Sequence, residues 1–440
     1  MLDLRDLPLS TPAAAARDLH ERALWHLVSF YGDPFAALDA TIAADPAWGL
    51  AQLTKANFIL TLTEPAMLPQ AQTAMAAATP LMTQANERER AHFAATQLAL
   101  AGRWREACAA WDQILHEHPR DMLALISAHL FDFYRGDARS LRARVARVLP
   151  EWPADDPLYP FVLGMHAFGL EECNLYPQAE DAGRQALALD PRGPWAIHAV
   201  AHVMEMQGRH HEGAAWLRER EGDWAVDNGL AVHNWWHSAL FRLESLDTAG
   251  ALALYDAQIG GSASSVNLQW LDGSALLWRL QLLGVDLGQR WDELARAWAD
   301  PVAHAGYYAF NDAHALLALL GSGDAARADE MLERARAVAE ASGDADNRAM
   351  AHEVGLPLMQ GLIALERGRP AETIAQLYPL RTVAHHFGGS HAQRDLIDQT
   401  LLAAAAQAGD KPLGHALLNE RRLAKPATPL TEHWAARLGA

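Results

Sequence analysis

The 440-residue chain has few of the residues that several protein classes require. Its two cysteines, Cys108 and Cys173, exclude a disulfide framework and a zinc site built from four thiolates. Lysine and arginine number 36 against 54 aspartates and glutamates, which gives a net charge of −18, and no run of five or six basic residues occurs. Such an acidic chain is repelled by phosphate backbones and anionic lipid headgroups. We therefore expect neither a nucleic-acid partner nor a membrane partner.

Long apolar runs are also missing. The longest mainly apolar stretch lies near residues 313–320, whereas a membrane-spanning helix needs about 20 such residues. The first residues, Met1-Leu-Asp-Leu-Arg-Asp, place acids where a secretory signal carries positive charge. We expect a cytoplasmic protein.

What the chain does contain is helical periodicity, interrupted by short breaks of glycine followed by a polar residue. Strand-length β-branched runs are scarce. Gly102 and Gly136 are 34 residues apart, and Tyr176 and Arg209 are 33 apart, close to the period of tetratricopeptide repeats. The pattern predicts an all-α fold, a right-handed α-solenoid of degenerate tetratricopeptide-like helix pairs. We expect one continuous solenoid over 1–440, with N-terminal repeats in 1–190, repeats carrying a polar groove in 191–410 and a capping segment in 411–440.

Uncommon polar residues fall in phase on the first helices of successive pairs, which line the concave face of such a solenoid. The predicted helix 194–207 carries His198, His202 and Glu205, and the predicted helix 230–243 carries His233, Asn234, Trp236 and His237. Helix 307–320 carries Asn311, Asp312 and His314, and helix 348–366 carries His352 and Glu353. Helix 389–405 carries His391, Gln393, Arg394 and Asp395. An unpaired buried polar group costs about 1–3 kcal/mol. Their clustering therefore favours a site for recognition or chemistry over a bare scaffold.

Each element of this pattern also has an ordinary structural interpretation. A histidine pair at i, i+4 can be a hydrogen-bonded core pair, and no His-Glu-x-x-His motif is present. Arg394 can pair with Asp395, or it can receive a carboxylate or phosphate of a ligand. Most of the 15 tryptophans are expected to pack between helices. Both cysteines are interpreted as buried small apolar residues.

Several segments resemble the tetratricopeptide repeat protein 38 family. The matching stretches are His198-Ala-Val-Ala-His-Val-Met-Glu-Met206, His233-Asn-Trp-Trp-His237, Gly288-Gln-Arg-Trp291, Phe310-Asn-Asp-Ala-His314, Val354-Gly-Leu-Pro357, Gly388-Gly-Ser390, Ala392-Gln-Arg-Asp395 and the tail from Glu420-Arg421 to Pro429. The resemblance implies a tetratricopeptide solenoid and no established reaction. It includes the same polar residues that the phase of the helices selects.

Two functions follow as alternatives. The first is a binding protein that holds a small polar molecule, or a specific peptide or protein partner, in the groove. Its ligand-binding residues would be Glu205, His233, Asn234, Trp236, Asn311, His314, Arg394 and Asp395. The second is an enzyme of hydrolase or proton-transfer type that uses His198, His202, His237 and Asp312. A divalent metal is possible as its cofactor, although nothing in the sequence requires one. The sequence leaves the oligomeric state open.

Overall fold

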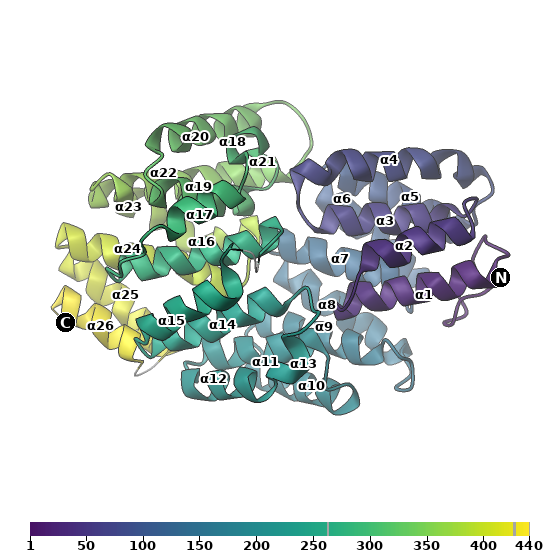
Figure 1. Cartoon of the computed structure of the whole chain (residues 1–440), viewed down its shortest axis with the longest axis horizontal. Coiled ribbons are helices and arrows are strands. Elements are labelled where there is room, and N and C mark those ends of the chain that lie inside the picture. Colours follow the sequence, from purple (N-terminus) through teal and green to yellow (C-terminus); the bar gives the residue numbers. More distant parts are fainter. Residues whose placement is uncertain (262–263, 426–427, 440) are drawn as a thin grey trace. The chain divides into compact units, whose positions relative to one another are not determined.

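The computed structural model describes residues 1–261, 264–425 and 428–439, and within these ranges the chain is a succession of helices (Figure 1). No β-strand forms among these residues. Two isolated bridges occur, Leu2 with Pro8 and Tyr31 with Asn228. The predicted all-α class is confirmed, and neighbouring helices pack as hairpins. No helix in the described ranges is long and apolar enough to cross a membrane.

The predicted breaks are the turns of the hairpins. Gly102 and Gly136 have φ of +75° and +63°, a left-handed conformation that glycine adopts without steric cost. Aspartates begin many of the following helices. Asp137, for example, accepts a hydrogen bond from the backbone N–H of Ser140 at 3.0 Å. Local sequence therefore sets where each helix ends and the next begins.

The chain divides into two compact units. The first comprises residues 1–200, 226–230 and 344–346, and the second comprises residues 201–225, 231–343 and 347–440. The predicted single solenoid, with boundaries at 190 and 410, stays a prediction. The capping segment predicted for 411–440 contains residues 426–427 and 440, which lie outside the described ranges.

In the first unit, consecutive helices pack against one another from α1 to α10. They are α1 (Ala14–Ser29), α2 (Pro34–Ala44), α3 (Gly49–Thr61), α4 (Leu68–Ala78), α5 (Glu87–Leu100), α6 (Trp104–Glu117), α7 (Met122–Tyr134), α8 (Ala138–Val148), α9 (Tyr159–Glu172) and α10 (Tyr176–Leu189). Trp104 and Trp111 of α6 are buried, as expected for packing residues. Cys108 is buried too, but the expectation for Cys173 is wrong. It is only half-buried, with its thiol 3.2 Å from the carbonyl of Ala138.

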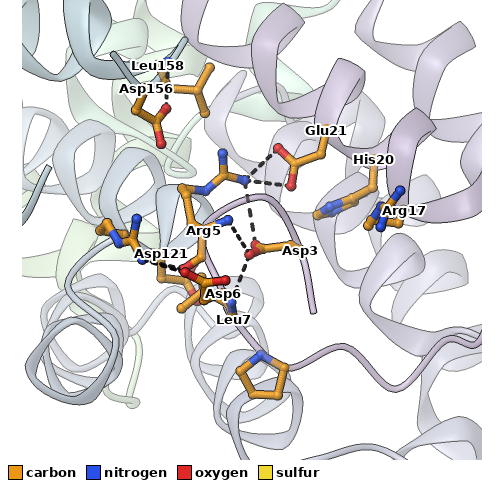
Figure 2. A network of polar contacts seen from close by, with 12 residues as sticks. Asp3, Arg5, Asp6, Leu7, Arg17, His20, Glu21, Asp121, Asp156 and Leu158 are labelled. Atoms are coloured by element: carbon orange, nitrogen blue, oxygen red, sulfur yellow. Dashed lines mark hydrogen bonds and ion pairs between the residues drawn. The ribbon is translucent and has the colours of Figure 1, made fainter. Parts of the chain in front are cut away.

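A polar network fixes the N-terminal segment to α1 (Figure 2). The buried guanidinium of Arg5 donates to both carboxylate oxygens of Glu21, at 2.7 and 2.6 Å. Asp3 accepts the backbone N–H groups of Arg5 and Leu7, at 2.8 and 2.9 Å. Burial lowers the pKa of Arg5, but the Glu21 carboxylate outweighs it and the net shift is upward. The segment before α1 is thus anchored through a buried ion pair.

The second unit is built around α16 (Asn267–Leu282), which packs against α14, α19 and α24. Its other helices are α12 (His210–Glu219), α13 (Glu221–Trp224), α14 (Ala231–Glu244), α15 (Thr248–Leu254), α17 (Arg290–Ala297), α18 (Pro301–His304), α19 (Ala309–Gly321), α20 (Ala325–Glu340), α22 (Leu356–Glu366), α23 (Pro370–Leu377), α24 (His391–Ala408), α25 (Lys411–Ala424) and α26 (Pro429–Leu438). The chain passes from the first unit to the second within α11 (Pro194–Met206), after residue 200. It does so again within α21 (Asp346–Met350), after residue 346.

The five helices predicted to carry polar rows exist close to their predicted bounds. The segment 348–366 differs, because a π-helical turn at Ala351–Gly355 separates α21 from α22. Pro357 follows this turn in the sequence, lacks an amide hydrogen and cannot continue regular α-helical hydrogen bonding. His352 and Glu353 lie on this turn and are exposed, and Glu353 bonds His386 Nδ1 at 2.8 Å.

Candidate functional site

Three histidines of the second unit form a cluster. His202 lies on α11, and His233 and His237 lie one turn apart on the same stripe of α14. Each ring offers a nitrogen atom, and these nitrogens all lie within 4.8 Å of one another. The ring centroids of His202 and His237 are 4.4 Å apart, and those of His233 and His237 are 4.9 Å apart. We call His202, His233 and His237 the histidine cluster.

His198 lies one turn before His202 on α11 and is also buried. Its ring centroid is 5.3 Å from that of Phe168, in the first unit. The sequence prediction treated His198 and His202 as one pair, and both rings are indeed buried.

Two buried carboxylates orient the rings of the cluster. Glu205, also on α11, accepts from His237 Nδ1 at 2.8 Å. Asp272 of α16 accepts from His233 Nδ1 at 2.9 Å. An ionised carboxylate can only accept, so in that state of Glu205 and Asp272 each bond places the ring proton on Nδ1 and the lone pair on Nε2. The sequence analysis selected Glu205 as a candidate site residue but did not select Asp272.

Burial sets the charge states of these groups. It lowers the pKa of His202 and His237 well below the usual value, and the neighbouring histidines add to this effect. It raises the pKa of Glu205 to about 7, although the nearby Lys425 ammonium acts in the opposite direction. The Glu205 carboxyl group, which titrates near pH 7 beside neutral imidazoles, can therefore take up or release a proton under physiological conditions.

Trp236 and Arg279 support the cluster. The Trp236 ring stacks on His233, with centroids 5.2 Å apart and planes at 15°. The guanidinium of Arg279 lies 5.5 Å from the Trp236 centroid and donates to the carbonyls of Ala275 and Ala392, at 3.0 and 2.9 Å. Trp236 is completely buried, so it positions His233 and does not present a surface to solvent.

A second polar group joins the end of α14 to the C-terminal helices. Glu244 accepts from Arg421 Nη2 at 2.6 Å and from Lys425 Nζ at 3.1 Å. Asp395 of α24 accepts from Arg421 Nη1 at 3.1 Å. Lys425 Nζ also lies 3.7 Å from Glu205 Oε1. These five residues, here called the ion-pair network, are buried or nearly so.

Opposite charges within the network control its titration. Burial raises the pKa of Glu244, but Arg421 and Lys425 outweigh it and hold that pKa at about 2. Asp395 follows the same pattern, since burial is outweighed by Lys425 and Arg421 and its pKa is lowered. For Lys425, burial is outweighed by Glu244 and Asp395, which raise the pKa. Glu244, Asp395 and Lys425 are therefore charged at neutral pH.

A pocket of about 430 Å³ opens beside the ion-pair network. Its wall is formed by α24, α25, the short turns that precede α24 and Met206 at the end of α11. Its charged and polar lining residues are Arg381, His385, His391, Arg394, Asp395, Asp398, Glu420, Arg421 and Lys425, and its apolar ones include Ile397, Leu402 and Leu417. Two of the residues predicted to bind ligand, Arg394 and Asp395, thus line a real cavity.

The backbone before α24 positions Arg394. Its guanidinium donates to the carbonyl of Gly389 and lies 3.2 Å from His391 Nδ1. Gly389 has φ of +74°, and a Cβ there would lie 2.3 Å from a ring carbon of Phe310. Ser390 then begins α24 with a reciprocal capping box to Gln393. The sequence analysis left two partners open for Arg394, either Asp395 or an acidic group of a ligand. Asp395 forms an ion pair with Arg421 at 3.1 Å.

The residues predicted on α19 make local contacts. Asp312 accepts the backbone N–H of Gly306 at 2.9 Å, and His314 Nδ1 bonds the carbonyl of Phe310 at 2.8 Å. Burial raises the pKa of Asp312 to about 7, with the Gly306 hydrogen bond acting against it. Asn311 is buried beside them. Asp312 and His314 are thus each bonded to a nearby backbone group, and their predicted roles in catalysis and binding stay predictions.

Asn234 of α14 differs from its neighbours. Its side chain is fully buried, and neither polar atom of the amide has a hydrogen-bond partner among the described residues. Leaving such groups unsatisfied is unfavourable by about 1–3 kcal/mol.

Sequence reasoning missed three cationic residues and one carboxylate of these groups. Arg421 and Lys425 lie in the segment predicted as a cap, and Arg279 and Asp272 lie on α16, which carries no polar row. The only available signal for Arg421 was its place in the tail that resembles the tetratricopeptide repeat protein 38 family.

No protein-family model matches the sequence. Among solved structures, the chain is similar to human IFIT1, in a dimer with m7Gppp-AAAA, at 14% identity and a TM-score of 0.42, over 99% of this chain and 96% of that one. It is also similar to a chain of the Naa15/Naa10 complex bound to HypK-THB, at 13% identity and a TM-score of 0.28, over 97% and 80% of the two chains. Likeness at these values carries no conclusion about ligand or partner.

Proposed function

We propose that the second unit binds a small organic anion in the pocket beside α24 and α25. The observation that carries this proposal is the pocket lining. Four arginine and lysine side chains and two histidines line the pocket, against three carboxylates, in a chain whose net charge is −18. The cavity volume of about 430 Å³ lies within the range of small-molecule sites.

The residues that line the pocket indicate two features of the ligand, an acidic group and an apolar body. Arg394 can hold a carboxylate or phosphate through two parallel hydrogen bonds, a geometry that suits a guanidinium. Ile397, Leu402 and Leu417 offer apolar surface to the rest of the molecule. The ligand is therefore an organic acid with an apolar body, and a peptide carboxyl end is a larger ligand of the same chemistry.

The test is a thermal-shift screen of the untagged protein against small organic carboxylates and phosphates. A ligand that binds only the folded state stabilises it by mass action, by about 2.7 kcal/mol at a ligand concentration of 100 times Kd. The melting temperature rises accordingly. Arg394→Gln should abolish the shift. Arg367→Gln, at an exposed arginine that pairs with Asp329 at 2.6 Å, should keep it. An unchanged shift in Arg394→Gln would refute the assignment.

An enzyme of hydrolase or proton-transfer type is the second candidate. It is favoured by the buried pair of His237 and Glu205, because burial lowers the pKa of the imidazole and raises that of the carboxyl to about 7. If the ligand is turned over, His237→Gln should remove turnover and leave binding at Arg394 intact.

The remaining parts of the proposal concern family, partners and location. They are membership of the tetratricopeptide repeat protein 38 family, the absence of nucleic-acid and membrane partners, and a cytoplasmic location. They are supported by the motifs from His198 to Pro429 and by the net charge of −18.

A further inference from the structure

We propose that His202, His233 and His237 bind one divalent transition-metal ion of the zinc type, each through a ring nitrogen. None of the three residues lines the pocket described above, so this site goes beyond the proposed anion binding. The donor set defines the class of ion, because imidazole nitrogens suit zinc, copper, nickel, cobalt and iron, whereas magnesium and calcium prefer oxygen.

The spacing of the ring nitrogens supports the assignment. They lie within 4.8 Å of one another. A tetrahedral ion at about 2.1 Å from each nitrogen would place them about 3.4 Å apart. The rings need to close by no more than about 1.4 Å, which side-chain rotation provides on two rigid helices. His233 and His237 already share one stripe of α14.

The carboxylates provide an independent observation. A metal-bound histidine usually donates its other ring N–H to a carboxylate or carbonyl, which fixes the tautomer and orients the ring. Two of the three rings carry such a partner, with His237 Nδ1 at 2.8 Å from Glu205 and His233 Nδ1 at 2.9 Å from Asp272. Both acceptors are buried, so neither arrangement is an incidental surface contact.

Three protein nitrogens leave one position of a tetrahedral ion for water or another small ligand. Glu205 links the histidine cluster to the pocket, since it contacts both His237 and Lys425, at 2.8 and 3.7 Å. Lys425 lines the pocket. A metal at the cluster would thus be connected to the anion site through a single carboxylate.

The test is a titration of the metal-depleted, untagged full chain with Co²⁺ and with Zn²⁺. We expect one equivalent of Co²⁺ with a visible absorption band typical of tetrahedral coordination, and Zn²⁺ should displace it. Elemental analysis after dialysis gives the stoichiometry. Absence of a band, together with less than a tenth of an equivalent of either metal, would overturn the proposal.

Single-residue variants test whether the metal ion binds at the histidine cluster. His233→Ala should remove the band, and because this side chain is 16% exposed its loss is tolerated better than that of a fully buried ring. His314→Ala is the matched control, since His314 is a buried histidine bonded to the Phe310 carbonyl on α19, and it should keep the band. Glu205→Gln should keep the band but weaken affinity about 10–100-fold.

Circular dichroism of each variant tests whether it is folded. A band that survives His233→Ala, or that disappears equally in His314→Ala, contradicts the site. Glu205→Gln with unchanged affinity contradicts the orienting role of the carboxylate. Arg394→Gln, which tests the anion pocket, should leave the cobalt band unchanged, so the two proposals fail separately.

Discussion

The charge of Glu244 is predicted to be a major contribution to the stability of the second unit. Its carboxylate is about 5% exposed and receives Arg421 at 2.6 Å and Lys425 at 3.1 Å. Glu244→Gln keeps the volume of the side chain and removes only its charge. The two buried cations then retain Asp395, and Lys425 retains Glu205 at 3.7 Å.

Two independent routes give the size of the effect. Removing one partner from a buried ion pair costs about 3–5 kcal/mol, because an uncompensated charge stays behind. The pKa of Glu244 falls from 4.5 to about 2 on folding, and at about 1.4 kcal/mol per unit this corresponds to about 3 kcal/mol. We therefore expect Glu244→Gln to lower the free energy of unfolding by about 3 kcal/mol at pH 7.

The pH dependence identifies the cause. Because folding lowers the pKa of Glu244, the contribution of its charge to folding stability is complete above about pH 4.5 and is lost as the pH falls through about 2. The deficit of Glu244→Gln relative to the wild type should shrink over this range. Urea unfolding at pH 7, 5 and 3 measures it.

The control is Glu432→Gln, at an exposed pair with Arg422 at 3.4 Å, which should change stability by less than about 1 kcal/mol. A Glu244→Gln protein within 1 kcal/mol of the wild type at pH 7, or a deficit that does not change with pH, would refute the reasoning.

Three further predictions concern other buried groups. Burial raises the pKa of Asp312 from 3.8 to about 7, so the contribution of Asp312 to folding stability is complete below pH 3.8 and is lost as the pH rises towards 7. Asp312→Asn should therefore raise the free energy of unfolding by up to about 4 kcal/mol at pH 7 and by little at pH 4. Equal effects of the substitution in urea unfolding at both pH values would contradict this. Asn234→Leu removes an amide with no hydrogen-bond partner among the described residues and should raise the melting temperature; an unchanged or lower melting temperature would contradict this. Gly389→Ala puts a Cβ against Phe310 at φ of +74° and should lower stability by at least about 1–2 kcal/mol; an unchanged urea midpoint would disprove the strain.

The sequence was sufficient for features that depend on local spacing. Helix ends follow from glycines and capping aspartates, which act on their own turn. The i, i+4 spacing of His233 and His237 places both rings on one stripe whatever the tertiary structure. The cluster could therefore be expected before its partners were known.

Partners that arrive from distant segments could not be predicted. Arg421 and Glu244 are separated by 177 residues, and no periodicity connects them. Asp272 and Arg279 lie on an otherwise apolar face of α16, where a sequence pattern suggests an ordinary buried helix. His352 and Glu353 differ from the other polar residues of these helices, because they lie on the π-helical turn and are exposed.

Calorimetric titration of the most stabilising organic anion into the wild type and into Arg394→Gln tests the central claim most directly. Anion binding in the pocket predicts one site per chain. It also predicts a loss of about 10–100-fold in affinity in Arg394→Gln, the equivalent of a hydrogen bond to a charged group. Saturable heat of equal affinity in both proteins, or none with any anion of the panel, would contradict it.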